Sequence, residues 1–282
     1  MEFVAINSLY FAQATLWGAG GDVSWEDART SASLDNRYFM AALSSITAEG
    51  THILEHIFLT SEVTSGVYAL RLFLRGKPWV VTVDDKFWAE DDGLHLHLKF
   101  AAIYRDHVWA PVLEKAWAKV MGTYAATAGG HAVDALHALT GAPVFQLLTS
   151  AHATGAAVFA DVEASVAKGY LITACTKAAT GASGLASNKY FSVIDTFRLA
   201  TNTIELILVR DPSGLNTYAG TYKHPLSNPT VWTSALLAEV SYLSYIRGDP
   251  NEVRVDDSLF FISSDEFLEA FETYQVAHYR YD

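Results

Sequence analysis

The chain has 282 residues, of which 51% are hydrophobic and 13% aromatic, so it can bury a sizeable core in one large domain or two ordinary ones. This composition excludes an intrinsically disordered chain. The formal net charge of −12, with no basic cluster in the sequence, argues against nucleic acid as a partner because the surface repels phosphates.

The sequence carries no signal for a membrane or for secretion. No uninterrupted apolar run approaches the ~18 residues that span a bilayer, and the N-terminus has neither a basic stretch nor a glycine at position 2. We therefore expect a cytoplasmic protein that does not insert into membranes. The single cysteine, Cys175, excludes an internal disulfide. It lies in an apolar run with no basic partner or helix start beside it, which predicts a buried strand thiol.

Two long helices are predicted in the first half of the chain. Apolar residues recur at helical spacing across residues 39–46, and Asp35 or Asn36 can cap the start of this helix. A second apolar stripe covers residues 109–120, after a candidate cap at Asp106.

Between these helices, two runs with period-two alternation, residues 67–73 and 79–83, predict a β-hairpin. A glycine pair at positions 129–130 then breaks the helical pattern. We place a domain boundary there, which divides the chain into residues 1–128 and 129–282.

The second domain is expected to be rich in strands. Strand patterns occur at residues 170–174, 191–197 and 203–209. Two short helices are predicted at residues 232–241 and 264–274, the second opened by a Ser-Ser-Asp-Glu cap at residues 263–266. The stretch 176–187 has almost no bulky side chain and predicts a loop.

Several segments follow a known pattern in the same order along the chain. They are residues 66–73, 80–85, 109–124, 129–130, 139–141 and 257–263. Together they resemble the protease core of the calpain family, with the longest match at residues 109–124. The resemblance implies an α+β, papain-like fold in which a helical first lobe and a β-rich second lobe face each other across a cleft.

The same resemblance locates the family's catalytic positions. Residues 34–43, 184–193 and 210–214 resemble the Cys, His and Asn segments, and the three catalytic positions fall on Arg37, Lys189 and Asp211. Ser31 stands where the family has its oxyanion-stabilising glutamine. A guanidinium is neither a nucleophile nor an acid at any working pH, so we predict no catalytic residue and no proteolysis. We expect either an ion pair between Lys189 and Asp211 or solvation of both side chains.

Calpain cores also bind calcium, which needs several oxygen ligands around one point. The positions that match the family's calcium ligands are occupied by Ala28, His107, Thr217, His224 and Leu259. Only Asp257 keeps a carboxylate. We therefore expect no calcium, no other metal and no cofactor, and a melting temperature that calcium does not change.

One motif points to a different enzyme. His52, Glu55 and His56 match the H-x-x-E-H pattern, in which two histidines one helical turn apart bind zinc and the glutamate acts as a base. The same residues would also serve as ordinary helix positions. A zinc-dependent hydrolase is therefore an alternative function.

A protease scaffold without its catalytic residues predicts a binding role. Calpain-like proteins of this kind occur in several protist lineages, and some are tied to the submembrane cytoskeleton. The resemblance therefore implies a non-catalytic pseudoprotease that acts as a protein-binding scaffold with a cytoskeletal partner. The cleft between the lobes is a candidate groove for an extended peptide. The other alternative is a regulatory module that restrains an active calpain-like partner.

Overall fold

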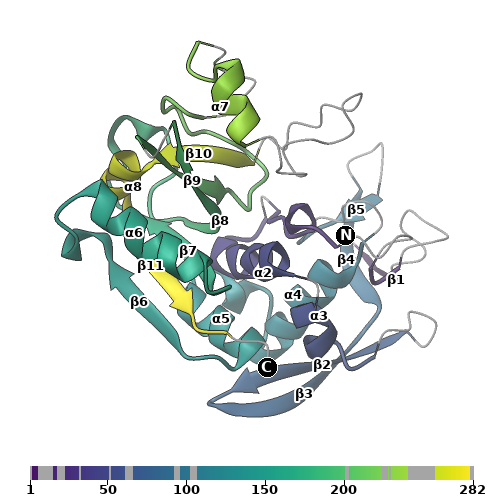
Figure 1. Ribbon diagram of the computed structural model, residues 1–282. Coiled ribbons are helices and arrows are strands. Elements are labelled where there is room, and N and C mark those ends of the chain that lie inside the picture. Colours follow the sequence, from purple (N-terminus) through teal and green to yellow (C-terminus); the bar gives the residue numbers. More distant parts are fainter. Residues whose placement is uncertain are drawn as a thin grey trace. The chain divides into compact units, whose positions relative to one another are not determined.

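The computed structural model of the chain (Figure 1) describes residues 2–5, 15–17, 23–31, 33–50, 52–60, 66–91, 96–101, 107–200, 203–223, 228, 230–240 and 258–279. Contacts divide the chain into two units, Met1–Val144 with Ala277–Asp282, and Phe145–Val276. Both units contain helices and strands, so the expected α+β class is confirmed.

The division between the units lies beyond the glycine pair at positions 129–130. Helix α5 (Ala132–Thr140) packs on α2 (Arg37–Glu49) and on strand β2 (Val67–Leu74), which places it in the first unit. The glycine pair forms a turn inside this unit, where the Gly129 amide donates to the Asp35 carbonyl at 2.9 Å. The contact division therefore differs from the expected bounds of 1–128 and 129–282, because the apolar face of α5 is buried against the first unit.

The helices of the first unit largely follow the apolar pattern. Helix α2 ends at Gly50, whose amide donates to the Ile46 carbonyl at 3.1 Å. Helix α3 (His52–Ile57) follows it, and the short 3₁₀ helices are η1 (Trp25–Asp27) and η3 (Ala125–Thr127). Helix α4 (Trp109–Met121) begins after Val108 as its N-cap residue, so the cap predicted at Asp106 is wrong. Asp106 itself lies outside the described residues.

The predicted hairpin is confirmed. Strands β2 and β3 (Lys77–Asp84) pair antiparallel, with Leu74 opposite Lys77. The two loop residues between them, Arg75 and Gly76, both have positive φ angles, of 52° and 74°. This is the type I′ geometry that matches the right-handed twist of paired strands.

A second sheet in the first unit has three strands in the order β1-β4-β5. Its strands are β1 (Glu2–Ala5), β4 (Lys86–Asp91) and β5 (Leu96–Leu98), and both neighbouring pairs are antiparallel.

The second unit is built on a six-stranded sheet in the order β10-β9-β8-β7-β11-β6. Its strands are β6 (Val144–Leu148), β7 (Leu171–Thr176), β8 (Tyr190–Leu199), β9 (Ile204–Arg210), β10 (Leu259–Ser263) and β11 (Phe271–Ala277). Helices α6 (Gly155–Val166) and α8 (Ser264–Ala270) contact each other and pack against the sheet (Figure 1). Helix α7 (Ser234–Glu239) and the 3₁₀ helices η4 (Thr149–Ala151) and η5 (Gly181–Ser183) complete the unit. Its core is a buried cluster of apolar side chains centred on Phe159, Phe191 and Phe267.

Three strands of this sheet, β7, β8 and β9, lie where the sequence predicted them. The cap at residues 263–266 is also confirmed, because Ser263 and Glu266 form a reciprocal capping box. The helix predicted through residue 274 is wrong in its last four residues. They form the start of β11, because Phe271 and Tyr274 are buried in the core of the sheet.

Candidate functional site

Arg37 is the first residue of α2, and a buried hydrogen bond fixes the residue before it. The Asn36 side chain does not cap the helix. Its Nδ2 instead donates to Oε1 of Glu114 on α4 at 2.6 Å. The other oxygen of Glu114 accepts from the Ala101 amide at 2.8 Å. A single carboxyl group therefore ties the start of α2 to two other segments of the first unit.

Burial dominates the chemistry of that carboxyl group. It raises the pKa of Glu114 to about 7, although the hydrogen bonds from Ala101 and Asn36 act in the opposite direction. Oδ1 of Asn36 is buried without a hydrogen-bond partner in the described part of the chain. The start of α2 therefore contacts a carboxyl group of α4 that titrates near neutral pH, and Asn36 itself has an unsatisfied acceptor.

The resemblance assigns the nucleophile position of a thiol protease to Arg37, whose guanidinium is not a nucleophile. A cysteine at a helix N-terminus is stabilised as a thiolate by the helix dipole, whereas a guanidinium placed there is a permanent cation. The other first-unit position, Ser31, uses its hydroxyl locally, since Oγ accepts from the Ser33 amide at 3.1 Å. Both side chains lie where the sequence placed them, before and at the start of α2.

Lys189 and Asp211 belong to the second unit and lie next to strands of its sheet. Lys189 precedes β8, and its backbone amide donates to Oγ1 of Thr176 at 3.0 Å. Asp211 follows β9 and is only 3% exposed. Its Oδ1 accepts from the Ser213 amide at 2.8 Å, so the carboxylate stabilises the turn after the strand. The ion pair between Lys189 and Asp211 stays a prediction.

The chain's one thiol lies in strand β7 and is not activated. Burial raises the pKa of Cys175 to about 11, and the nearby Glu272 carboxylate adds to the shift, which outweighs the opposite effect of Lys189. At neutral pH the group is therefore a neutral thiol, which is a poor nucleophile. The expected strand position of Cys175 is confirmed, although the residue is half-buried rather than fully buried.

One of the two first-unit positions that the resemblance assigns to calcium ligands, His107, is hydrogen-bonded to a carboxylate. His107 Nδ1 lies 2.8 Å from Oδ2 of Asp27, the residue before Ala28. The same oxygen accepts from Nε1 of Trp109 at 2.9 Å and from the Ser24 amide at 3.0 Å. A buried carboxylate therefore joins the 24–28 segment to the start of α4.

In the second unit, the described positions that the resemblance assigns to calcium ligands have no carboxylate. Thr217 lies in the segment between β9 and α7, and Leu259 is the first, buried residue of β10. His224 and Asp257 lie outside the described residues.

The H-x-x-E-H motif forms most of helix α3. His56 Nδ1 lies 2.7 Å from the His52 carbonyl oxygen, within hydrogen-bond distance in the same helix. Among the described residues, no group of three His, Cys, Asp or Glu side chains is placed to hold a metal ion. A zinc site on His52 and His56 would therefore need a third ligand from a source other than the described residues.

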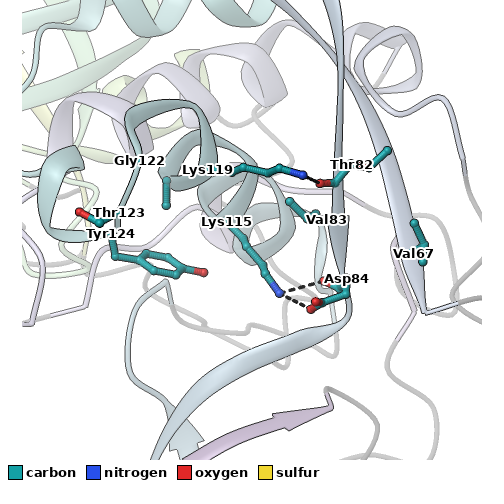
Figure 2. Close-up of a pocket in the computed structure, with 10 residues that line it drawn as sticks. Val67, Thr82, Val83, Asp84, Lys115, Lys119, Gly122, Thr123 and Tyr124 are labelled. Atoms are coloured by element: carbon teal, nitrogen blue, oxygen red, sulfur yellow. Dashed lines mark hydrogen bonds and ion pairs between the residues drawn. The ribbon is translucent and has the colours of Figure 1, made fainter.

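A cavity of ≈ 500 Å³ lies between β3 and the C-terminal half of α4 (Figure 2). Lys119 Nζ donates to the Thr82 carbonyl at 2.6 Å, and the Lys115 ammonium contacts both the carboxylate and the carbonyl of Asp84. The Tyr124 hydroxyl faces Lys115, and burial raises its pKa. The two lysines of the cavity thus link α4 to strand β3. This cavity was not predicted from the sequence, in which the i, i+4 spacing of Lys115 and Lys119 on α4 was the only available signal.

Residues 21–278 match the model of the calpain family of cysteine proteases. The chain belongs to the calpain family. The papain-like protease core expected from the sequence is therefore confirmed at the level of the family.

Curated relatives point to the same family. The chain is 28% identical over 223 residues to calpain-12 of Mus musculus, which covers 75% of this chain and 28% of that protein. It is 26% identical over 258 residues to calpain-12 of Homo sapiens, covering 86% and 33%. It is 35% identical over 109 residues to the calpain-type cysteine protease DEK1 of Zea mays, covering 38% and 5%. This calpain chain thus spans a third or less of the length of these relatives.

The described helices of the calpain chain have at most 13 residues. None of those in the described ranges has both the length and the apolar character needed to cross a bilayer.

Proposed function

We propose that this calpain-family chain is a non-catalytic pseudoprotease that binds other proteins as a scaffold, with a cytoskeletal partner in the cytoplasm. One observation carries the proposal. The helix start that the resemblance assigns to the nucleophile has Arg37, while the only thiol, Cys175, lies in a sheet strand with a pKa raised to about 11. Neither side chain can attack a peptide carbonyl as a thiolate at neutral pH.

The remaining positions of the former catalytic set support the same conclusion. A lysine ammonium at Lys189 cannot accept a proton from a nucleophile while it is charged, unlike a neutral imidazole. The Asp211 carboxylate accepts a hydrogen bond within its own turn. Ser31 is shorter than the glutamine it replaces and is bonded locally. Each position has lost the chemistry that proteolysis needs.

Calcium independence is part of the proposal. Calcium sites in proteins gather six to eight oxygen ligands. Here Ala28 offers only a methyl group, and His107 offers an imidazole that is already hydrogen-bonded to Asp27. The hydrogen bonds to Asp27 link the segments that a metal would otherwise join.

Proteolysis is tested directly with the purified chain. A fluorogenic calpain peptide and casein are each incubated with it, with and without millimolar calcium, beside an active calpain as the positive control. We expect no turnover above the blank. Turnover that disappears on Arg37→Ala, Lys189→Ala or Asp211→Ala would overturn the proposal, and the Cys175→Ser variant would identify any activity that depends on the thiol.

Partner capture tests the binding role and separates it from the regulatory alternative. The tagged chain is cross-linked in a native lysate and the captured proteins are identified by mass spectrometry. Cytoskeletal proteins are the expected partners. Capture of active calpain-like proteases, together with inhibition of their activity by the purified chain, would instead favour a regulatory module.

The zinc-hydrolase alternative rests on His52, Glu55 and His56 and is tested by metal analysis. We expect far less than one equivalent of zinc in the purified chain, even after incubation with the metal. Stoichiometric zinc that is lost on His56→Ala would favour the hydrolase.

A further inference from the structure

The first unit has a second and larger cavity, at the tip of the β2–β3 hairpin. Its volume is ≈ 660 Å³, within the range of small ligand pockets. Apolar side chains from three elements form its walls: Phe73 from β2, Trp79 from β3, and Trp117 and Val120 from α4. Helix α5 completes the lining. The cavity therefore offers an apolar surface, and neither Arg37 nor Ser31 is among its lining residues.

The two tryptophans of this cavity differ in how they are held. Trp117 is buried, its Nε1 donates to the Tyr38 hydroxyl at 2.8 Å, and its ring stacks on Phe39 at 5.4 Å. Trp79 is 58% exposed. One wall is therefore rigid and the other is an aromatic surface open to solvent, as found at the centres of protein interfaces.

The charged side chains at the cavity indicate which ligand charge it would favour. Arg75 and Lys77 supply two positive charges, and Asp134 supplies one carboxylate. The Nδ1 atom of His137 lies 3.0 Å from the Ala142 carbonyl oxygen. The described lining is thus positive on balance, although the whole chain carries a net charge of −12. A local positive charge on an acidic protein favours a ligand with carboxylates, whereas the overall charge repels a long polyanion.

The backbone at Arg75 supports a role for this side chain. Its φ of 52° lies in the left-handed region, which costs a residue other than glycine about 1 kcal/mol. Asparagine or glycine is the usual choice at the first position of a type I′ turn. An arginine here brings a guanidinium to the cavity despite this cost.

We propose that this cavity binds a short segment of a partner protein that carries a bulky apolar side chain next to one or more carboxylates. The apolar side chain packs between Trp79 and Trp117, and the carboxylates pair with Arg75 and Lys77. This inference rests on the proposed protein-binding function, and it adds the place and the chemistry of one contact.

The test is selection from a random heptapeptide library displayed on phage, using the purified full chain as bait. Enriched peptides are synthesised, and their Kd is measured by fluorescence polarisation. We expect Phe, Trp, Leu or Ile beside Asp or Glu in the enriched sequences. Trp79→Ala should weaken binding at least tenfold. Arg75→Glu should weaken it at least fivefold, and raising the salt concentration should weaken binding to the wild type.

Val80→Ala is the matched control, because Val80 is 62% exposed on the same strand but points to the opposite face. It should leave the Kd within twofold. Arg75 and Trp79 are both exposed, and each variant is checked by its melting temperature. Selection that enriches no peptide, enriched peptides without carboxylates, or binding unchanged by both Trp79→Ala and Arg75→Glu would overturn the proposal.

These outcomes are separable from a failure of the proposed function. If the chain captures its protein partners equally well with Trp79→Ala, the scaffold function holds and the cavity assignment fails. If selected peptides bind at Trp79 but the chain cleaves casein, the cavity assignment holds and the pseudoprotease assignment fails.

Discussion

Glu114 gives the protein a pH-dependent stability of unusual sign for a carboxyl group. The unfolded chain releases this proton near the ordinary pKa of 4.5, and the folded chain releases it near 7. Between these values the folded state binds more protons than the unfolded state, so the free energy of unfolding falls as pH rises. The total contribution of this group is roughly 3 kcal/mol, fully present below pH 4.5 and lost above pH 7.

We predict that Glu114→Gln removes this slope. A glutamine can accept from the Ala101 amide and, after the Asn36 amide rotates, can donate to the buried Oδ1 of Asn36. The variant should be more stable than the wild type by about 1–3 kcal/mol at pH 7.5, because it has no charge to bury. Urea denaturation at pH 5, 6, 7 and 7.5 measures the difference.

The contrasting variant is Glu114→Ala. It leaves the donors of Asn36 and Ala101 unpaired in the interior and opens a cavity, so it should lose stability at every pH. Parallel pH profiles for the wild type and Glu114→Gln would contradict the assigned role of this carboxyl group.

At the residue scale, the sequence could not reveal Glu114. The apolar stripe of α4 runs through Trp109, Leu113 and Ala116, and a glutamate beside that stripe reads as a solvated position. In the structure α4 is buried on both faces along its first turns, so Glu114 is also enclosed. Arg37, in contrast, was placed at its helix start from the sequence, because the apolar pattern of residues 39–46 begins just after it.

At the scale of elements, α6 and α8 approach closely at Gly155, the first residue of α6. A Cβ at this position would lie 2.5 Å from the Asp265 amide nitrogen and 2.6 Å from the Ser264 carbonyl carbon. Backbone atoms cannot move aside as the end of a side chain can. We therefore predict that Gly155→Ala destabilises the chain by about 1–3 kcal/mol, although alanine is the better helix former.

Thermal unfolding followed by circular dichroism measures this change. Ala156→Ser is the matched control, because Ala156 is exposed in the same turn of α6 and should change stability by less than about 0.5 kcal/mol. A Gly155→Ala variant as stable as the wild type would show that the helices can separate without loss.

Two elements of the second unit that were not predicted from the sequence, α6 and the start of β11, owe their structure to packing in the sheet. Phe267, Phe271 and Tyr274 are at helical spacing, so residues 264–274 read as one helix. Pairing within the sheet overrides that local preference from Phe271 onward. Helix α6 was not predicted, although Thr154 caps it by accepting from the Ala157 amide at 3.2 Å. The many alanines of this helix form a weak apolar pattern in the sequence. Beyond the Thr154 cap, burial of its apolar side chains against the sheet stabilises the helix.

At the scale of the whole molecule, the resemblance of several segments in the same order along the chain was enough to predict the α+β class and the calpain family. The glycine pair did not predict where the chain divides into two units, because the packing of α5 determines that position. A turn signal marks where the backbone can bend, but it does not say which core the next helix joins.

Calcium binding would act on the whole molecule, and its predicted absence is measurable as a thermal shift. A ligand present at 100 times its Kd stabilises the folded state by about 2.7 kcal/mol. For a chain of this size that corresponds to about 5 °C or more in Tm. We predict a Tm change below about 1 °C between excess EGTA and 1 mM calcium, with magnesium as the control ion.

The Asp27–His107 contact provides the matching variant. His107→Ala removes a buried partner of the Asp27 carboxylate, whose other oxygen already lacks a partner among the described residues, so stability should fall by about 1–3 kcal/mol. If a hydrogen bond has taken the structural place of a metal, calcium should not restore the Tm of this variant. A calcium-dependent rise in Tm for the wild type, or rescue of His107→Ala by calcium, would mean that an oxygen-rich site persists in the chain.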